Sequence, residues 1–127
     1  MVYEQITENV QGVVTRIKGL IKQKPIIGQK KPGGGWEYTG DELASETSNL
    51  ANELNNDDYK CNVLHLIQGG TIQNPTGHVL IIPLNGTASF ERDEPILPCH
   101  YIEQERTIFG ANLDLIIVAL EKKPSIV

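Results

Sequence analysis

Residues 78–84 read His-Val-Leu-Ile-Ile-Pro-Leu and lead directly into Asn85-Gly86. A short, uninterrupted run of branched apolar residues is typical of a strand that is buried on both faces. Pro83 has no amide hydrogen to donate to a neighbouring strand, so it must lie near the end of this one. Asn-Gly is the strongest short signal for a β-hairpin, and residues 87–91 are therefore expected to form the returning strand.

Further strands are expected on both sides of this stretch. Residues 60–68 (Lys-Cys-Asn-Val-Leu-His-Leu-Ile-Gln) and 113–120 (Leu-Asp-Leu-Ile-Ile-Val-Ala-Leu) are rich in branched apolar residues, and residues 99–108 can extend. The segment 74–77, Asn-Pro-Thr-Gly, predicts a β-turn with proline at its second position. Residues 110–112 predict a second turn, and residues 92–98, with two prolines, predict a loop. The pattern indicates four or five mostly antiparallel strands.

The N-terminal part of the chain predicts two helices. The first is expected from Tyr3 to Gln23, because its apolar residues recur at spacings of three and four and so form one stripe. That stripe consists of Tyr3, Ile6, Val10, Val13, Ile17 and Leu20. The second follows a capping box in which Thr39 is the N-cap and Glu42 reaches back to it, and extends to about Asn55. Its inward positions are Leu43, Thr47, Leu50, Ala51 and Leu54, and residues 55–58 (Asn-Asn-Asp-Asp) close it.

Two helices followed by strands indicate an α+β fold: two N-terminal helices packed on one face of a four- to five-stranded, mostly antiparallel sheet. With 127 residues, the whole chain (1–127) is expected to form a single domain. Packing of the first helix on its own sheet is the simplest use of its apolar stripe. A homodimer contact is the alternative.

Composition and charge disfavour some classes of partner. Sixteen acidic residues against eleven basic ones give a formal charge of −5, which disfavours binding to duplex nucleic acid and to anionic membranes. No run of about 18 apolar residues is present, and the N-terminus lacks the basic and apolar regions of a secretory signal. Two cysteines do not make a disulfide framework. A cytoplasmic protein with reduced thiols is therefore expected.

The segment from residue 24 to 38 predicts an irregular loop with proline and three successive glycines. Successive glycine amides can cradle an anion, and a mobile tryptophan can clamp a ligand or a partner. The segment lacks the order of a P-loop or of a dinucleotide fingerprint, so no cofactor is expected. The candidate ligand-binding residues are Lys30, Lys31, Gly33, Gly34, Gly35 and Trp36. A solvated linker between the helices is the alternative.

The soft metal ligands do not have the spacing of a metal site. They are Cys61, His65, His78, Cys99 and His100. No pair of them shows the C-x2-C or H-x3-H spacing that favours zinc, so we expect no metal site. If residues 60–68 form a strand, Cys61, Val63, His65 and Ile67 share one face, which is typical of ordinary core.

Cys61 and His78 also suggest a thiol enzyme. The strings Tyr59-Lys60-Cys61-Asn62 and Gly77-His78-Val79-Leu80-Ile81 resemble the two motifs of NlpC/P60-type papain-fold hydrolases. The resemblance implies that Cys61 is the nucleophile, that His78 is its base and that a peptide or amide bond is cleaved. The chain departs from that family in two ways. Only 17 positions separate the two residues, and residues 60–68 favour a strand where the family has a helix.

The carboxylates form no convincing acid–base pair. Asp114 is unusual because it enters an otherwise apolar strand, so its carboxylate must find a donor or stay at the end of the sheet. The leading interpretation is a non-enzymatic, intracellular binding or regulatory module. It is expected to be a homo-oligomer and to contact a protein or small molecule through residues 28–38 and the nearby sheet edge. The alternative is a small cysteine hydrolase or amidase that uses Cys61 and His78.

Overall fold

The computed structural model describes residues 7–30, 34–54, 60–91, 94–96 and 99–121. The helices are α1 (Glu8–Gln23) and α2 (Asp41–Glu53). The strands are β1 (Ile27–Lys30), β2 (Trp36–Tyr38), β3 (Lys60–Leu66), β4 (Gly70–Ile72), β5 (Val79–Asn85), β6 (His100–Ile102), β7 (Arg106–Ile108) and β8 (Leu113–Ala119). Neither α1 nor α2 has the length and hydropathy that a membrane-crossing helix requires.

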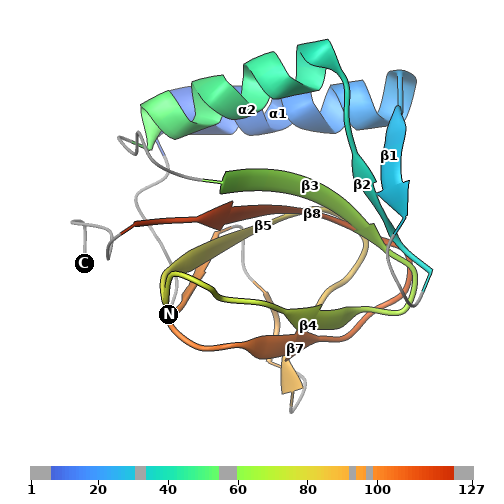
Figure 1. Cartoon of the computed structure of the whole chain (residues 1–127), viewed down its shortest axis with the longest axis vertical. Helices are drawn as coiled ribbons and strands as arrows, with labels where there is room; N and C mark the ends of the chain where they lie inside the picture. The colour runs from blue at the N-terminus through green and yellow to red at the C-terminus, as the bar shows by residue number, and fades with distance from the viewer. Residues whose placement is uncertain (1–6, 31–33, 55–59, 92–93, 97–98, 122–127) are drawn as a thin grey trace.

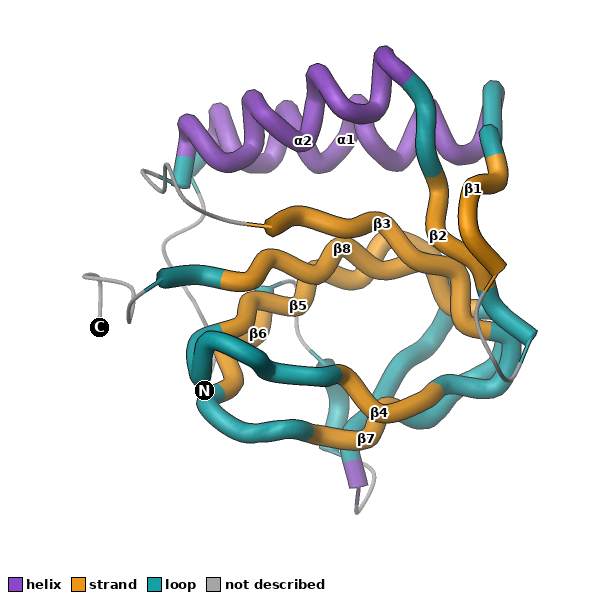
Figure 2. The backbone as a smooth tube through the Cα atoms, in the orientation of Figure 1, coloured by secondary structure: helices purple, strands orange, loops and turns teal. Residues whose placement is uncertain are grey.

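The elements form three layers. Six strands make the main sheet in the order β1-β2-β3-β8-β5-β6, and β4 and β7 make a small second sheet. Neighbouring strands pair antiparallel in both sheets. Helices α1 and α2 lie together over one face of the main sheet, and the β4–β7 pair lies on its other side (Figure 1). Figure 2 shows the same layers as a tube, with both helices above the strands.

Helix α1 begins and ends as its sequence requires. Thr7 is the N-cap, and its hydroxyl accepts a hydrogen bond from the amide of Val10 at 3.1 Å. The buried residues Val10, Val13, Ile17 and Ile21 recur at spacings of three, four and four. Leu20, expected on the buried stripe, is only half-buried, because Ile21 continues the 3.6-residue period better. The predicted positions Tyr3 and Ile6 lie outside the described residues.

Helix α2 begins differently from the prediction. Its N-cap is Gly40, which has no side chain to cap the helix, so the predicted capping box of Thr39 and Glu42 is wrong. The acidic side chains of Asp41 and Glu42 in the first turn complement the positive end of the helix dipole instead. The predicted inward residues Leu43, Leu50 and Ala51 are buried, whereas Thr47 and Leu54 are half-buried. The predicted closing turn at residues 55–58 lies outside the described residues.

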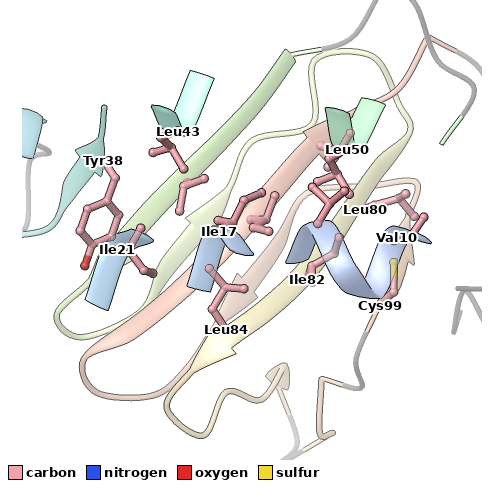
Figure 3. Packing of buried hydrophobic residues seen from close by; sticks show 14 of the residues in the cluster. Val10, Ile17, Ile21, Tyr38, Leu43, Leu50, Leu80, Ile82, Leu84 and Cys99 are labelled. Carbon is pink, nitrogen blue, oxygen red and sulfur yellow. The ribbon is translucent and has the colours of Figure 1, made fainter. Parts of the chain in front are cut away.

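The main sheet has a hydrophobic core on each face. Between helices and sheet, α1 and α2 residues pack on alternate residues of β5 and β8, and Figure 3 shows Ile17 and Leu50 facing Leu80 and Ile82. The second core lies between the main sheet and the β4–β7 pair and includes the fully buried Phe90. Strand β8 sends Ile116 and Val118 to the first core and Leu113, Leu115 and Ile117 to the second. This central strand is therefore apolar on both faces, as its sequence indicated.

The predicted hairpin at Asn85-Gly86 is wrong. Strand β5 pairs with β8 and β6, and residues 87–91 leave the sheet. Ala88 and Phe90 are buried in the second core, and Ser89 pairs with Phe109. The physical reason is burial: the returning segment gains more by placing its apolar side chains in the second core than by pairing with β5. The β-turn at residues 74–77 is confirmed by a 3.3 Å hydrogen bond from the amide of Gly77 to the carbonyl of Asn74.

The structure confirms the α+β class, the two helices and the mostly antiparallel sheet, but the predicted count of four or five strands is too low. Four of the strands have only three residues each: β2, β4, β6 and β7. Strands this short give no alternating pattern in the sequence. In addition, the hairpin of β1 and β2 lies between the two helices along the chain.

Candidate binding surface

The segment between the helices is a β-hairpin, which corrects the prediction of an irregular loop from residue 24 to 38. Strands β1 and β2 pair antiparallel, with Ile27 opposite Tyr38 and Lys30 opposite Trp36. A β-bulge lies between Ile27 and Lys30, since three steps along β1 match two along β2. Strand β2 then pairs with β3, so the hairpin extends the main sheet. The prolines and glycines of this segment hid the two short strands.

The two edges of the main sheet differ in exposure. All three residues of β6 are buried, whereas all four residues of β1 are exposed. Ile27 on β1 is 50% exposed, and Ile26, which precedes the strand, is 51% exposed. No other described strand pairs with the outer side of β1. An open edge with exposed aliphatic side chains is a template for an added strand.

The pairing register also fixes where the backbone of Ile27 points. The amide of Thr39 donates to the carbonyl of Ile26 at 2.8 Å, so Ile26 and Thr39 form a hydrogen-bonded pair. The next pair, Ile27 and Tyr38, is therefore non-hydrogen-bonded. In such a pair, both backbone polar groups point away from the partner strand. The N–H and C=O of Ile27 thus face outward from the sheet.

A pocket of about 250 Å³ lies at the start of this edge strand. The end of α1, the start of α2 and the base of the hairpin line it, with Leu20, Ile21, Ile26, Tyr38 and Leu43 as its apolar walls. Figure 3 shows Tyr38 beside Ile21 on the face of the sheet that carries the helices.

Charged groups surround this pocket. Lys24, Asp41 and Glu42 line it, and Lys24 and Glu42 form an exposed ion pair at 3.6 Å. A cavity of this size fits one aliphatic side chain or a small organic group.

A row of polar and aromatic side chains anchors the hairpin to the sheet. Trp36 on β2 lies opposite His65 on β3, His65 lies opposite Asp114 on β8, and Asp114 lies opposite Asn85 on β5. Asn85 reaches this position through the register shift between Pro83 and Asn85. The indole of Trp36 stacks on the imidazole of His65, with ring centroids 4.2 Å apart. We call these four residues the cross-strand row.

Asp114 accepts hydrogen bonds from three directions. Its Oδ1 is 2.7 Å from the hydroxyl of Tyr38 and 2.8 Å from Nδ1 of His65. Its Oδ2 accepts from Nδ2 of Asn85 at 3.1 Å. The side chains of His65 and Asp114 are only 12% and 13% exposed. The expectation that Asp114 must find donors is confirmed, and its partners tie β2, β3, β5 and β8 together.

Tyr38 belongs to both the polar network and the pocket wall. Burial, together with the hydrogen bond to Asp114 and the negative charge of that carboxylate, raises the pKa of Tyr38 to about 12. The indole N–H of Trp36 opposes this rise, although it does not reach hydrogen-bond geometry with any group of the described residues. Tyr38 therefore stays protonated and keeps donating to Asp114 across the neutral range.

The predicted ligand-binding residues fall into four groups. Lys30 and Gly34 are exposed. Gly35 is buried, and a Cβ at that position would lie 2.2 Å from the carbonyl oxygen of His65, so close approach of the chain to β3 requires glycine here. Trp36 is half-buried against His65 and the first core, which makes it part of the hairpin's anchor. Lys31 and Gly33 lie outside the described residues.

Cys61 and His78 lie on opposite sides of β8, and His78 forms its hydrogen bond with another residue. Cys61 and Leu80 both pair with Val118, from opposite sides of β8, so two strand spacings, or about 10 Å, separate their backbones. His78 lies two residues beyond Leu80, and its Nδ1 is 2.6 Å from the hydroxyl of Tyr101. Cys61 is on a strand, not at the start of a helix, and packs against the first core. Burial raises the pKa of its thiol to about 12, the opposite of what a thiolate nucleophile needs.

We therefore expect Cys61 to react slowly with iodoacetamide. At pH 8 a thiol of pKa about 12 is ionised about a thousandfold less than a free cysteine, so alkylation of the folded protein should be slower by a similar factor. Mass spectrometry of a Cys99→Ala variant, with and without urea, isolates the signal of Cys61. Fast alkylation of the folded chain below pH 8 would contradict this expectation and revive a catalytic thiol.

The remaining soft ligands are dispersed. Cys99 is buried, and burial raises the pKa of its thiol to about 12 as well. His100 is buried next to Phe90, and burial lowers the pKa of its imidazole. Among the described residues, no group of three or more histidine, cysteine, aspartate or glutamate side chains is arranged to hold a metal ion.

The sequence pointed to part of this surface. The isolated Asp114 in an apolar strand signalled the polar network, but Tyr38, His65 and Asn85 carry no local signal that they meet it. The edge strand was missed because it is short, follows Pro25 closely and contains Gly28. Comparison of the chain with protein-family models, with curated proteins and with solved structures gave no match. The surface therefore has to be interpreted from its own chemistry.

Proposed function

We propose that this protein is a non-enzymatic binding module that holds an extended segment of a protein partner along β1. The observation that carries the proposal is the contrast between the sheet edges: β6 is buried, whereas β1 is exposed along its whole length. Strand addition supplies affinity through backbone hydrogen bonds, and pockets beside the edge supply specificity. The outward backbone groups of Ile27 and the nearby 250 Å³ pocket match these two requirements.

The cross-strand row supports the proposal by giving the edge a rigid base. Strand β2 is attached to β3 by its backbone pairing, by the Trp36–His65 stack and by the hydrogen bond from Tyr38 to Asp114. A binding strand that is already ordered loses less conformational entropy when a partner is added. The proposed contact is thus β1 (Ile27–Lys30), and Trp36 on β2 supports it.

Selection from a displayed library of random peptides tests the proposal. The wild-type chain should enrich peptides that bind it, and an Ile27→Asp variant should lose that binding by about a hundredfold, because an exposed aliphatic contact becomes a desolvated charge. Phe109→Asp is the matched control, since Phe109 is equally exposed (49%) but follows β7 of the second sheet and pairs with Ser89. Enriched peptides that bind both variants equally well, or no enrichment at all, would count against β1 as the binding strand.

A further inference from the structure

Strand β1 carries opposite charges near its two ends. Lys30 is exposed at its C-terminal end. Ile26 comes directly before the N-terminal end of the strand and lies close to Gly40. If Gly40 carried a Cβ, that atom would be only 2.8 Å from Cδ1 of Ile26. Gly40 is followed directly by the exposed carboxylates of Asp41 and Glu42. Exposed Lys24 also lies at this end and pairs with Glu42, so Asp41 is left as its net negative charge, and Lys30 makes the other end positive.

Such an edge complements itself when two copies run antiparallel. We propose that the protein strand that occupies β1 is β1 of a second copy, so that two six-stranded sheets join edge to edge about a twofold axis. This inference rests on the proposed function and names its partner. Antiparallel pairing places Lys30 of each copy beside the acidic end of the other, and twofold symmetry makes this contact occur twice.

The residues of β1 also suit a pairing centred on Gly28. With the axis at this position, Ile27 of one copy lies opposite Gln29 of the other, and Lys30 lies opposite Ile26. At the axis, Gly28 of one copy lies opposite Gly28 of the other. The N–H and C=O of Ile27, which point outward, are free to pair with the second copy.

Apolar contact and charge then add to the backbone pairing. Ile26 and Ile27, each about half exposed, become covered in the dimer. Asp41 is the better acceptor for Lys30 of the second copy, because Glu42 already pairs with Lys24. The paired segment is only four residues long, so the dimer should be weak, should depend on protein concentration and should weaken as salt is added.

Light scattering and sedimentation velocity, from micromolar to near-millimolar protein, test this arrangement. The wild-type chain should shift from monomer to dimer over this range. Ile27→Pro, which removes the outward amide hydrogen but no hydrogen bond to β2, should keep the chain monomeric. Lys30→Glu should weaken the dimer about tenfold or more by placing like charges together at two places. The double variant Lys30→Glu with Asp41→Lys should restore it.

Lys18→Glu on α1 is the control with the same change of charge, and it should leave the dimer intact. A dimer that persists in Ile27→Pro, or that the charge reversal does not affect, uses another face and overturns the inference. A chain that stays monomeric at every concentration also overturns it. The peptide selection tests the proposed function separately, since a monomeric chain that still selects β1-dependent peptides would keep that function.

Discussion

Replacing Asp114 by alanine should lower the free energy of unfolding by about 3–5 kcal/mol, because three buried or half-buried donors lose their acceptor together. Tyr38, His65 and Asn85 all donate to this one carboxylate. A buried donor left without a partner costs about 1–3 kcal/mol. In a domain of this size the loss corresponds to a fall of about 10–20 °C in the melting temperature. Urea titration followed by circular dichroism measures it.

Two further variants show whether the network is the cause. Asp114→Asn keeps the shape of the side chain and one acceptor oxygen, so its loss should be intermediate. Glu105→Ala, which removes an exposed carboxylate, should change stability by less than about 0.5 kcal/mol. If Asp114→Ala costs no more than this control, the three hydrogen bonds do not stabilise the fold.

Phe90→Ala should be as damaging, for a different reason. Phe90 is 0% exposed in the second core, and the guanidinium of Arg106 lies over its ring, 3.8 Å from the centroid. Removing the ring leaves a cavity and deprives Arg106 of a cation–π contact. A buried phenylalanine replaced by alanine typically costs about 3–5 kcal/mol. The same urea titration measures the change.

The chain provides its own control for this experiment. It contains two phenylalanines, and the second, Phe109, is 49% exposed. Phe109→Ala should cost less than about 1 kcal/mol, because little apolar surface returns to water. If Phe90→Ala lowered the free energy of unfolding by as little as Phe109→Ala, the second core would add little to the stability of the protein.

Local patterns predicted the long elements of this fold and missed the short ones. The stripe on α1 and the apolar runs of β5 and β8 are long enough to show a period, so their type was correct. The strands of the β1–β2 hairpin have four and three residues, which is too few for a pattern. At Asn85-Gly86 a strong local turn signal gave way to burial of Phe90, a tertiary effect that no local window contains.

The site was less predictable than the fold because its residues meet only through the sheet. Tyr38 and Asp114 are 76 positions apart, and His65 and Asp114 are 49 apart. The sequence indicated that Asp114 needed donors and that the segment around Trp36 was unusual. It did not indicate that strand order and register would place them in one row. That information depends on β8 lying between β3 and β5.

The central place of β8 has a consequence for how the protein is made. Strand β8 is the last of the described strands to be synthesised, yet it separates β3 from β5 and supplies side chains to both cores. As the chain emerges from the ribosome, β3 and β5 have no common neighbour until residues 113–119 have left it. During that interval the apolar strands β3 and β5 are open to association with other chains. The main sheet is completed only when β8 inserts between β3 and β5.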